Sequence, residues 1–192
     1  MKVDILEEKK EDITAMNVAQ DLALEDGGIL TYRPTREATY LKMVQLLALR
    51  STCRRAQVGC IISDKIGLIR AIGYNGNPPG MPHCIDEECL IEDGHCISTL
   101  HAEMNAISRL EIPNPVTNIP YILRCFCTHA PCLACLKVGV TKGVMTWTYL
   151  THYEDKSRDK FIKWYNNGRR IEEVIISLQH VKVHNNGITI MA

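Results

Sequence analysis

The sequence lacks an excess of charge of either sign. Its 192 residues carry 22 Lys and Arg against 22 Asp and Glu, so the formal net charge is zero. A long nucleic-acid groove usually needs a basic excess to neutralise phosphates, and single-strand channels also need stacking rings. Only 6% of the residues are aromatic. We therefore expect no nucleic-acid partner, although one mononucleotide in a small basic pocket is compatible with this composition.

Long apolar runs are also missing. The first ten residues are charge-rich, unlike a signal peptide, and no stretch approaches the 18 apolar residues of a membrane span. We expect no membrane partner and a cytoplasmic location, in the host cytoplasm if the source is a virus.

Nine cysteines are many for this length. In a reducing compartment, clustered cysteines bind metal more often than they form disulfides.

The apolar spacing predicts one domain with an extension at each end. Residues 1–35 are an N-terminal extension, and residues 178–192 are a tail that could add an edge hairpin around 185–187. Between them, residues 36–177 alternate helical and strand patterns, which predicts an α/β domain with a mixed sheet. The helices are expected over 36–51, 101–111, 132–141 and 155–167, and the strands over 58–63, 68–74, 121–127, 144–149 and 171–175. The charge run 155–160 predicts a solvated helix face.

One spacing carries chemistry: His101-Ala102-Glu103 is followed by Pro131-Cys132-Leu133-Ala134-Cys135. Imidazole nitrogen and cysteine sulfur are preferred zinc ligands, and three of them leave a fourth corner open for water. Cys132 and Cys135 share one face at a helix start, where thiolates are favoured. Glu103 points elsewhere, so its carboxylate could take a proton from zinc-bound water. The pattern is typical of zinc-dependent nucleobase deaminases, with a closed structural zinc site as the alternative.

Further blocks surround this motif, at 51–59 (STCRRAQVG), 73–80 (GYNGNPPG), 94–96 (GHC) and 101–107 (HAEMNAI). In content and order they resemble the deoxycytidylate (dCMP) deaminase family of the cytidine deaminase superfamily. The resemblance runs from about Arg50 to Gly168. It implies a three-layer cytidine-deaminase-like fold, in which helices flank a mixed central sheet of about five strands.

The resemblance implies hydrolytic deamination of dCMP to dUMP and ammonia by zinc-bound hydroxide. His101, Cys132 and Cys135 would hold the zinc and Glu103 would move protons. Two alternatives stay open: a deaminase of another cytosine or adenine substrate, free or in nucleic acid, and a non-catalytic zinc-stabilised nucleotide sensor. Ala130 departs from the family, which often has Ser at that position.

The resemblance also implies binding residues and an assembly. The substrate would contact Asn75, Ala102, Thr128 and Tyr153. An allosteric nucleotide site would contain Asn75, Gly76, Asn77 and Gly80, at which dCTP activates and dTTP inhibits with a magnesium ion on the triphosphate. Family members are typically homo-hexamers, so a homo-hexamer is expected here.

The remaining cysteines and histidines predict a second, structural zinc site. Its candidate ligands are Cys53, Cys84, Cys89 and His95, with His83 and Cys96 as competing ligands. The loop that they bracket is too short and polar to form its own core, and four N/S ligands would close a structural site. Related enzymes with long inserts carry zinc on ligands matching Cys53, Cys84 and His95. The alternative is that these thiols pack as small apolar groups, which is the prediction for Cys60, Cys125 and Cys127.

Overall fold

The structure is a computed structural model, and it describes residues 33–111, 122–168, 177–183 and 188–191. Three predictions fall on residues outside these ranges: the extension up to residue 32, the strand over 171–175, and the turn at 185–187. Among the described residues, no helix is both long and apolar enough to span a membrane.

The described residues form four helices and eight strands. The helices are α2 (Arg36–Ala48), α3 (Ala102–Ser108), α4 (Leu133–Thr141) and α5 (Lys156–Gly168). The strands are β1 (Gly59–Asp64), β2 (Ile69–Tyr74), β3 (Ile91–Glu92), β4 (His95–Cys96), β5 (Leu123–His129), β6 (Val144–Thr151), β7 (Ser177–Val183) and β8 (Ile188–Ile190). The helices and the strands β1, β2, β5 and β6 lie close to the predicted bounds, whereas the short strands β3 and β4 were not predicted. Helix α2 begins at Arg36 because the Thr35 hydroxyl accepts a hydrogen bond from the Ala38 amide at 3.2 Å. Gly67 makes the β1–β2 turn with φ +87°, as expected.

Six strands form one mixed sheet in the order β2-β1-β5-β6-β7-β8. The β5–β6 and β6–β7 pairs are parallel, whereas β1–β2, β1–β5 and β7–β8 are antiparallel. The strand number exceeds the expected five because the C-terminal tail joins the sheet. Strand β7 lies largely within the tail and pairs with β6, and β8 completes the edge hairpin.

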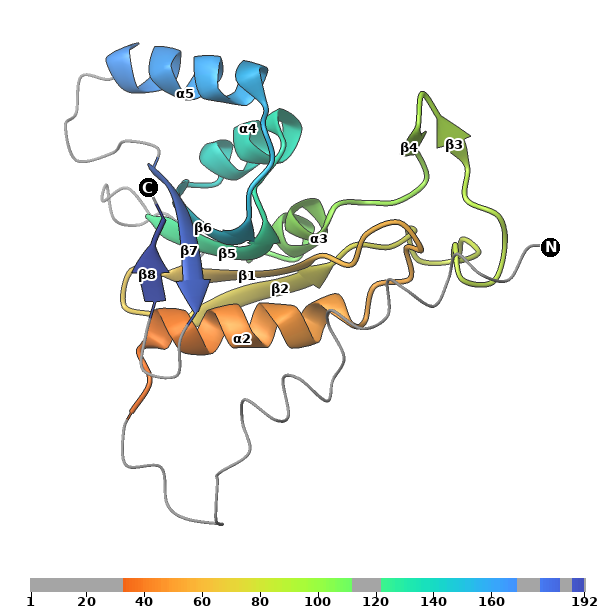
Figure 1. Ribbon diagram of the computed structural model, residues 1–192, viewed down its shortest axis with the longest axis horizontal. Coiled ribbons are helices and arrows are strands. Elements are labelled where there is room, and N and C mark those ends of the chain that lie inside the picture. Colours follow the sequence, from red (N-terminus) through yellow and green to blue (C-terminus); the bar gives the residue numbers. More distant parts are fainter. Residues whose placement is uncertain (1–32, 112–121, 169–176, 184–187, 192) are drawn as a thin grey trace.

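Alternation along the central strands builds a core on each face of the sheet. Ile61 and Phe126 pack with Leu41 of α2, whereas Cys60 and Cys127 pack on the opposite face. Figure 1 shows α2 below the sheet and α3, α4 and α5 above it. This is the three-layer arrangement that the sequence predicts.

The parallel strands determine where functional side chains can meet. The C-terminal ends of parallel β5 and β6 lie at the same edge of the sheet, where ligand sites of α/β folds form. The amide of Ala130 donates to the Thr151 carbonyl at 2.9 Å, so the two chain segments leave this edge together. Helix α4 follows β5, and the loop from β6 to α5 carries Tyr153. The start of α4 and this loop are therefore neighbours.

An insert over residues 77–100 separates β2 from α3. It contains the short antiparallel β3–β4 hairpin, which extends away from the body of the molecule (Figure 1). The side-chain oxygen of Asn77 accepts hydrogen bonds from Ser98 Oγ at 3.0 Å and Thr99 Oγ1 at 3.2 Å. Asn77 therefore ties the two ends of the insert together.

Candidate active site

His101, Cys132 and Cys135 converge at the first turns of α3 and α4. The Nδ1 atom of His101 lies 3.6 Å from Sγ of Cys132 and 3.5 Å from Sγ of Cys135. A tetrahedral zinc with Zn–S bonds of about 2.3 Å and Zn–N bonds of about 2.0 Å has N···S edges of about 3.5 Å. The three side chains therefore fit a zinc ion, and they supply three of its four ligands.

The start of α4 favours the thiolate form of Cys132, which can bind a cation. Cys132 is the N-cap residue, and its Sγ accepts a hydrogen bond from the Cys135 amide at 3.5 Å. The Cys135 thiol and then His101 lower the pKa of Cys132 to about 4, against the opposing effect of burial. The same thiol–thiolate pairing raises the pKa of Cys135. The pair thus holds one thiolate at neutral pH, which is the form that binds metal.

Glu103 lies in the first turn of α3 and is only 4% exposed. Burial raises the pKa of its carboxyl to about 7, although the charge of His101 opposes the shift. A carboxyl group with a pKa near neutral pH can both accept and donate a proton.

A pocket of about 450 Å³ opens over these residues. Its size falls within the range of about 300–1,000 Å³ that small ligands occupy. The metal-ligand candidates His101 and Cys132 line it together with Glu103. Its other polar lining side chains include Arg55, Asn75, Thr99, His95, His129 and Tyr153.

Asn75, a predicted substrate contact, is buried and lines the pocket. Its Oδ1 accepts from the Val58 amide at 2.8 Å and its Nδ2 donates to the Ala56 carbonyl at 2.8 Å. An amide side chain has two donors and two lone pairs, so one of each remains beyond these bonds. Asn75 therefore braces the 56–58 segment and keeps groups with which a ligand can bond.

The other predicted substrate contacts differ in whether they line the pocket. Ala102 and Tyr153 line the pocket, whereas Thr128 is not among the described residues that do. Thr128 Oγ1 instead accepts from the Gly59 amide at 3.3 Å and lies 3.0 Å from Nδ1 of His129. It therefore supports His129, which does line the pocket.

One sequence prediction is wrong: the run 155–160 is not wholly a solvated face. Arg158 is 0% exposed, and its guanidinium donates to the Pro131 carbonyl at 3.3 Å. The helical spacing of the sequence could have shown that Arg158 lies on the buried face of the helix. Arg158 lies three, four and seven residues before Phe161, Ile162 and Tyr165, all of which pack against the core.

Comparison with known proteins identifies the family of the chain. The family model for the cytidine and deoxycytidylate deaminase zinc-binding region matches residues 34–151. The chain belongs to this family. The matched region contains His101, Glu103, Cys132 and Cys135, so the converging side chains all lie within it.

Relatives within the family bear different names. ComE operon protein 2 of Bacillus subtilis (strain 168) is 42% identical over 119 residues, which is 60% of this chain and 59% of that protein. The deoxycytidylate deaminase of Saccharomyces cerevisiae is 31% identical over 138 residues, which is 68% of this chain and 43% of that protein. The match thus spans 59% and 43% of the lengths of these two relatives.

A solved structure extends the likeness to three dimensions. The dCMP deaminase of the cyanophage S-TIM5, in complex with dCMP and dUMP, superimposes with a TM-score of 0.56 and 28% sequence identity. The match covers 77% of this chain and 98% of that chain. The fold is therefore the cytidine-deaminase-like fold expected from the sequence.

A second group of thiols lies in the insert. The sulfur atoms of Cys84, Cys89 and Cys96 lie within 4.8 Å of one another, and that of Cys84 is 3.8 Å from that of Cys96. Hydrogen bonds from Ser98 and Thr99 lower the pKa of Cys96 to about 6, against the opposing effect of burial.

The other candidate ligands of this second site are not part of this three-sulfur group. Cys53 and His95 line the pocket beside His101, as Cys96 of the group also does. Nδ1 of His83 lies 3.2 Å from the hydroxyl of Thr52. The structure thus gathers Cys96, a competing candidate in the sequence, with Cys84 and Cys89.

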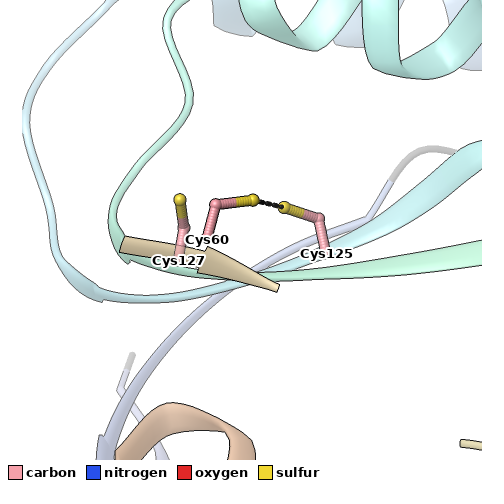
Figure 2. Close-up of side chains that lie close together, drawn as sticks. All are labelled: Cys60, Cys125 and Cys127. Carbon is pink, nitrogen blue, oxygen red and sulfur yellow. Dashed lines mark hydrogen bonds between the residues drawn. The ribbon is translucent and has the colours of Figure 1, made fainter. Parts of the chain in front are cut away.

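A third group of thiols lies in the core, as predicted. Figure 2 shows the sulfur atoms of Cys60, Cys125 and Cys127 on one side of their strands. The sulfurs of Cys60 and Cys125 are 3.4 Å apart. The hydrogen bond with Cys125 raises the pKa of Cys60, and burial raises that of Cys125. Neutral thiols in a closed core act as small apolar groups.

Proposed function

We propose that the chain catalyses the hydrolytic deamination of dCMP to dUMP and ammonia. The observation that carries the proposal is that the buried Glu103 lines the same pocket as His101 and Cys132, whose ligand atoms converge with that of Cys135. Relatives named deoxycytidylate deaminase support the choice of substrate, as does the cyanophage enzyme in complex with dCMP and dUMP.

Glu103 is the proton carrier of the proposed mechanism. When bound at His101, Cys132 and Cys135, zinc would make water acidic enough to act as a nucleophile near neutral pH. The Glu103 carboxylate takes a proton as water adds to C4 of cytosine. It delivers that proton to the ring nitrogen, then takes the second proton from the new C4 hydroxyl and passes it to the leaving amine as the C4 carbonyl forms. One water is consumed, the C4–N bond breaks, and ammonia leaves.

The pocket wall would orient the nucleotide. Asn75 lines the pocket and has one donor and one lone pair beyond its bonds to Val58 and Ala56, which would suit the sugar hydroxyl groups of the nucleotide. Arg55 is the arginine among the lining residues, and its guanidinium suits a phosphate. We propose that Arg55 contacts the 5′-phosphate, which would favour a nucleotide over a nucleoside.

The test is ammonia release by the zinc-loaded chain. The substrates are dCMP, deoxycytidine, cytidine and a cytosine-containing oligonucleotide at equal cytosine concentration. We expect dCMP to give the highest kcat/KM. Faster turnover of a nucleoside or of the oligonucleotide would identify a different deaminase. Binding of dCMP without ammonia release would identify a nucleotide sensor.

We also propose a structural zinc in the insert, held by Cys84, Cys89 and Cys96. The proximity of their sulfurs and the lowered pKa of Cys96 support it, and Cys53, His83 and His95 are candidates for the fourth ligand. Elemental analysis of the purified chain should find two zinc ions per chain, and Cys84→Ser should lower the ratio to one. A ratio of one in the unmodified chain would contradict the proposal.

We further propose regulation at the loop of Gly76, Asn77 and Gly80, with dCTP activating and dTTP inhibiting as magnesium complexes in a homo-hexamer. The family resemblance motivates this proposal. A backbone contact between the loop and the start of α3 supports a connection between the proposed allosteric site and the pocket. Gly76 and Leu100 exchange backbone hydrogen bonds of 3.2 and 2.9 Å. Asn75 and His101 directly adjoin these residues. Ammonia release with each triphosphate, with and without Mg²⁺, tests the regulation, and sedimentation tests the assembly.

A further inference from the structure

Arg158 is an arginine that the fold encloses completely. It is 0% exposed, although it lies in the first turn of α5 between the exposed residues Ser157 and Asp159. Burying a guanidinium is costly unless its N–H groups are paired. The hydrogen-bond partners of Arg158 therefore indicate its role in the fold.

The guanidinium bonds to two chain segments that border the pocket. Nη1 donates to the Pro131 carbonyl and Nη2 donates to the Tyr153 carbonyl, both at 3.3 Å. Pro131 directly precedes Cys132, and Tyr153 lines the pocket. The charge also lies over the ring of Tyr153, with Cζ 5.4 Å from the ring centroid. A further bond, from Nε to Asp159 at 3.0 Å, faces outward because Asp159 is half exposed.

Asp155 makes a second connection between the same two segments. Its Oδ2 accepts from the amide of Leu133, at the start of α4, at 3.2 Å. Its Oδ1 accepts from the amide of Arg158 at 2.8 Å and so caps α5. The start of α4 and the Tyr153 loop are thus joined twice by ionic side chains. Two such connections limit how Tyr153 can move relative to Cys132.

Tyr153 needs this support because it stands on a loop and keeps 38% of its surface exposed. A loop side chain without fixed neighbours loses rotamer and backbone freedom when a ligand binds, and that loss weakens binding. The ring faces Arg158 on one side, while the residue borders the pocket that also contains Glu103. Arg158 lies beyond residues 34–151, which the family model matches.

We propose that Arg158 is a positioning residue that holds Tyr153 in place at the pocket, so that the nucleotide binds to a preformed wall. This rests on the proposed deamination of dCMP. Arg158 touches no substrate in this account and acts through the carbonyl and ring of Tyr153. Its removal should weaken nucleotide binding and leave the chemical step largely intact.

The test uses Arg158→Met, which keeps the aliphatic stem and removes the bonds of the guanidinium. Lys160→Met is the matched control, because it makes a similar exchange at an exposed position of the same helix. For the zinc-loaded chain we expect KM for dCMP and Kd for dUMP, measured by calorimetry, to rise about tenfold, while kcat changes less than about threefold. Lys160→Met should match the wild type.

A double-mutant cycle with Tyr153→Ala separates positioning from general support of the fold. If Arg158 acts through Tyr153, adding Arg158→Met to Tyr153→Ala should change KM by less than about twofold. A similar tenfold rise in both backgrounds would overturn the proposal, as would wild-type KM and Kd in Arg158→Met. Should Arg158→Met fail to fold, Arg158→Lys replaces it, because one ammonium cannot reproduce the fork to two carbonyls. Wild-type KM in Arg158→Lys would then overturn the proposal.

These outcomes are distinct from a failure of the proposed function. If the wild-type chain releases no ammonia from dCMP, the function itself is wrong. If the wild-type chain is active and zinc contents are equal, but Arg158→Met or Arg158→Lys binds dUMP normally, only the role of Arg158 is wrong.

Discussion

Gly73 of β2 lies directly against Ala102 of α3. A Cβ atom on residue 73 would stand 2.3 Å from the Ala102 carbonyl oxygen and 2.6 Å from the Ala106 amide nitrogen. Because these are backbone atoms, they cannot rotate away as a side chain could. The absence of a side chain at Gly73 therefore sets how closely the helix that carries His101 and Glu103 approaches the sheet.

Gly73→Ala should push α3 away from β2. Overpacking of this kind costs about 1–3 kcal/mol of unfolding free energy, and a site displaced with α3 should also lose activity. Urea denaturation and ammonia release measure the two effects. Gly168→Ala is the control, because no heavy atom lies within 4 Å of a Cβ built there. Equal stability of the two variants would contradict the close contact.

Arg55→Met should discriminate between nucleotide and nucleoside. If the guanidinium binds the 5′-phosphate, its loss should lower kcat/KM for dCMP about tenfold or more and leave deoxycytidine nearly unchanged. Arg54→Met is the matched control, because Arg54 is exposed and donates to the Ile85 carbonyl at 2.7 Å. Equal losses for both substrates would exclude a phosphate contact.

Asp64 should make stability depend on pH. Burial opposes ionisation, but bonds from the Leu68 amide and from Arg70 lower the pKa of this carboxyl below its ordinary value. The ionised form therefore contributes stability above an unfolded pKa of about 4, and this is lost as pH falls through the folded pKa. Asp64→Asn should lose about 1–2 kcal/mol at pH 6, and the difference from wild type should shrink below pH of about 4.

The exposed pair of Glu37 and Arg124 provides the control for Asp64. Its charged atoms are 3.5 Å apart and both side chains are more than one-third exposed. Glu37→Gln should therefore change the unfolding free energy by less than about 0.5 kcal/mol. Urea denaturation across the pH range measures both variants. A pH-independent loss in Asp64→Asn would show that its charge is not the cause.

The three core thiols should resist alkylation. Cys60, Cys125 and Cys127 are buried, and their raised pKa values keep them protonated, whereas the thiolate is the reactive form. Iodoacetamide should leave all three unmodified in the native chain at neutral pH and modify them after unfolding, as read by peptide mass spectrometry. Native-state modification at the unfolded rate would contradict the packing.

The proximity of the candidate catalytic residues was predictable because their sequence relationships are local. Cys132 and Cys135 are three residues apart at a helix start, and Glu103 is two residues from His101, so spacing alone fixes much of their geometry. The insert is different. His95 and Cys96 are neighbours on β4, where successive side chains point to opposite faces. Which of them joins Cys84 and Cys89 depends on the path of the insert, and the sequence leaves that path open.

Arg158 was missed because a charged residue usually marks a solvated face. Its burial depends on acceptors from distant segments, the carbonyls of Pro131 and Tyr153. Similarly, the tail was expected to form an edge hairpin, but the parallel pairing that joins its strand β7 to β6 is long-range, and local propensity does not specify it.

The central claim is that Glu103 carries protons beside a zinc held by His101, Cys132 and Cys135. The most direct test compares Glu103→Gln with the wild type in zinc content and in ammonia release from dCMP, with the exposed Glu111→Gln as control. Glu103→Gln should keep its zinc and lose about 10²–10⁴-fold in kcat, because an amide cannot accept the proton. Glu111→Gln should match the wild type in both. Wild-type turnover in Glu103→Gln at full zinc occupancy would contradict the account.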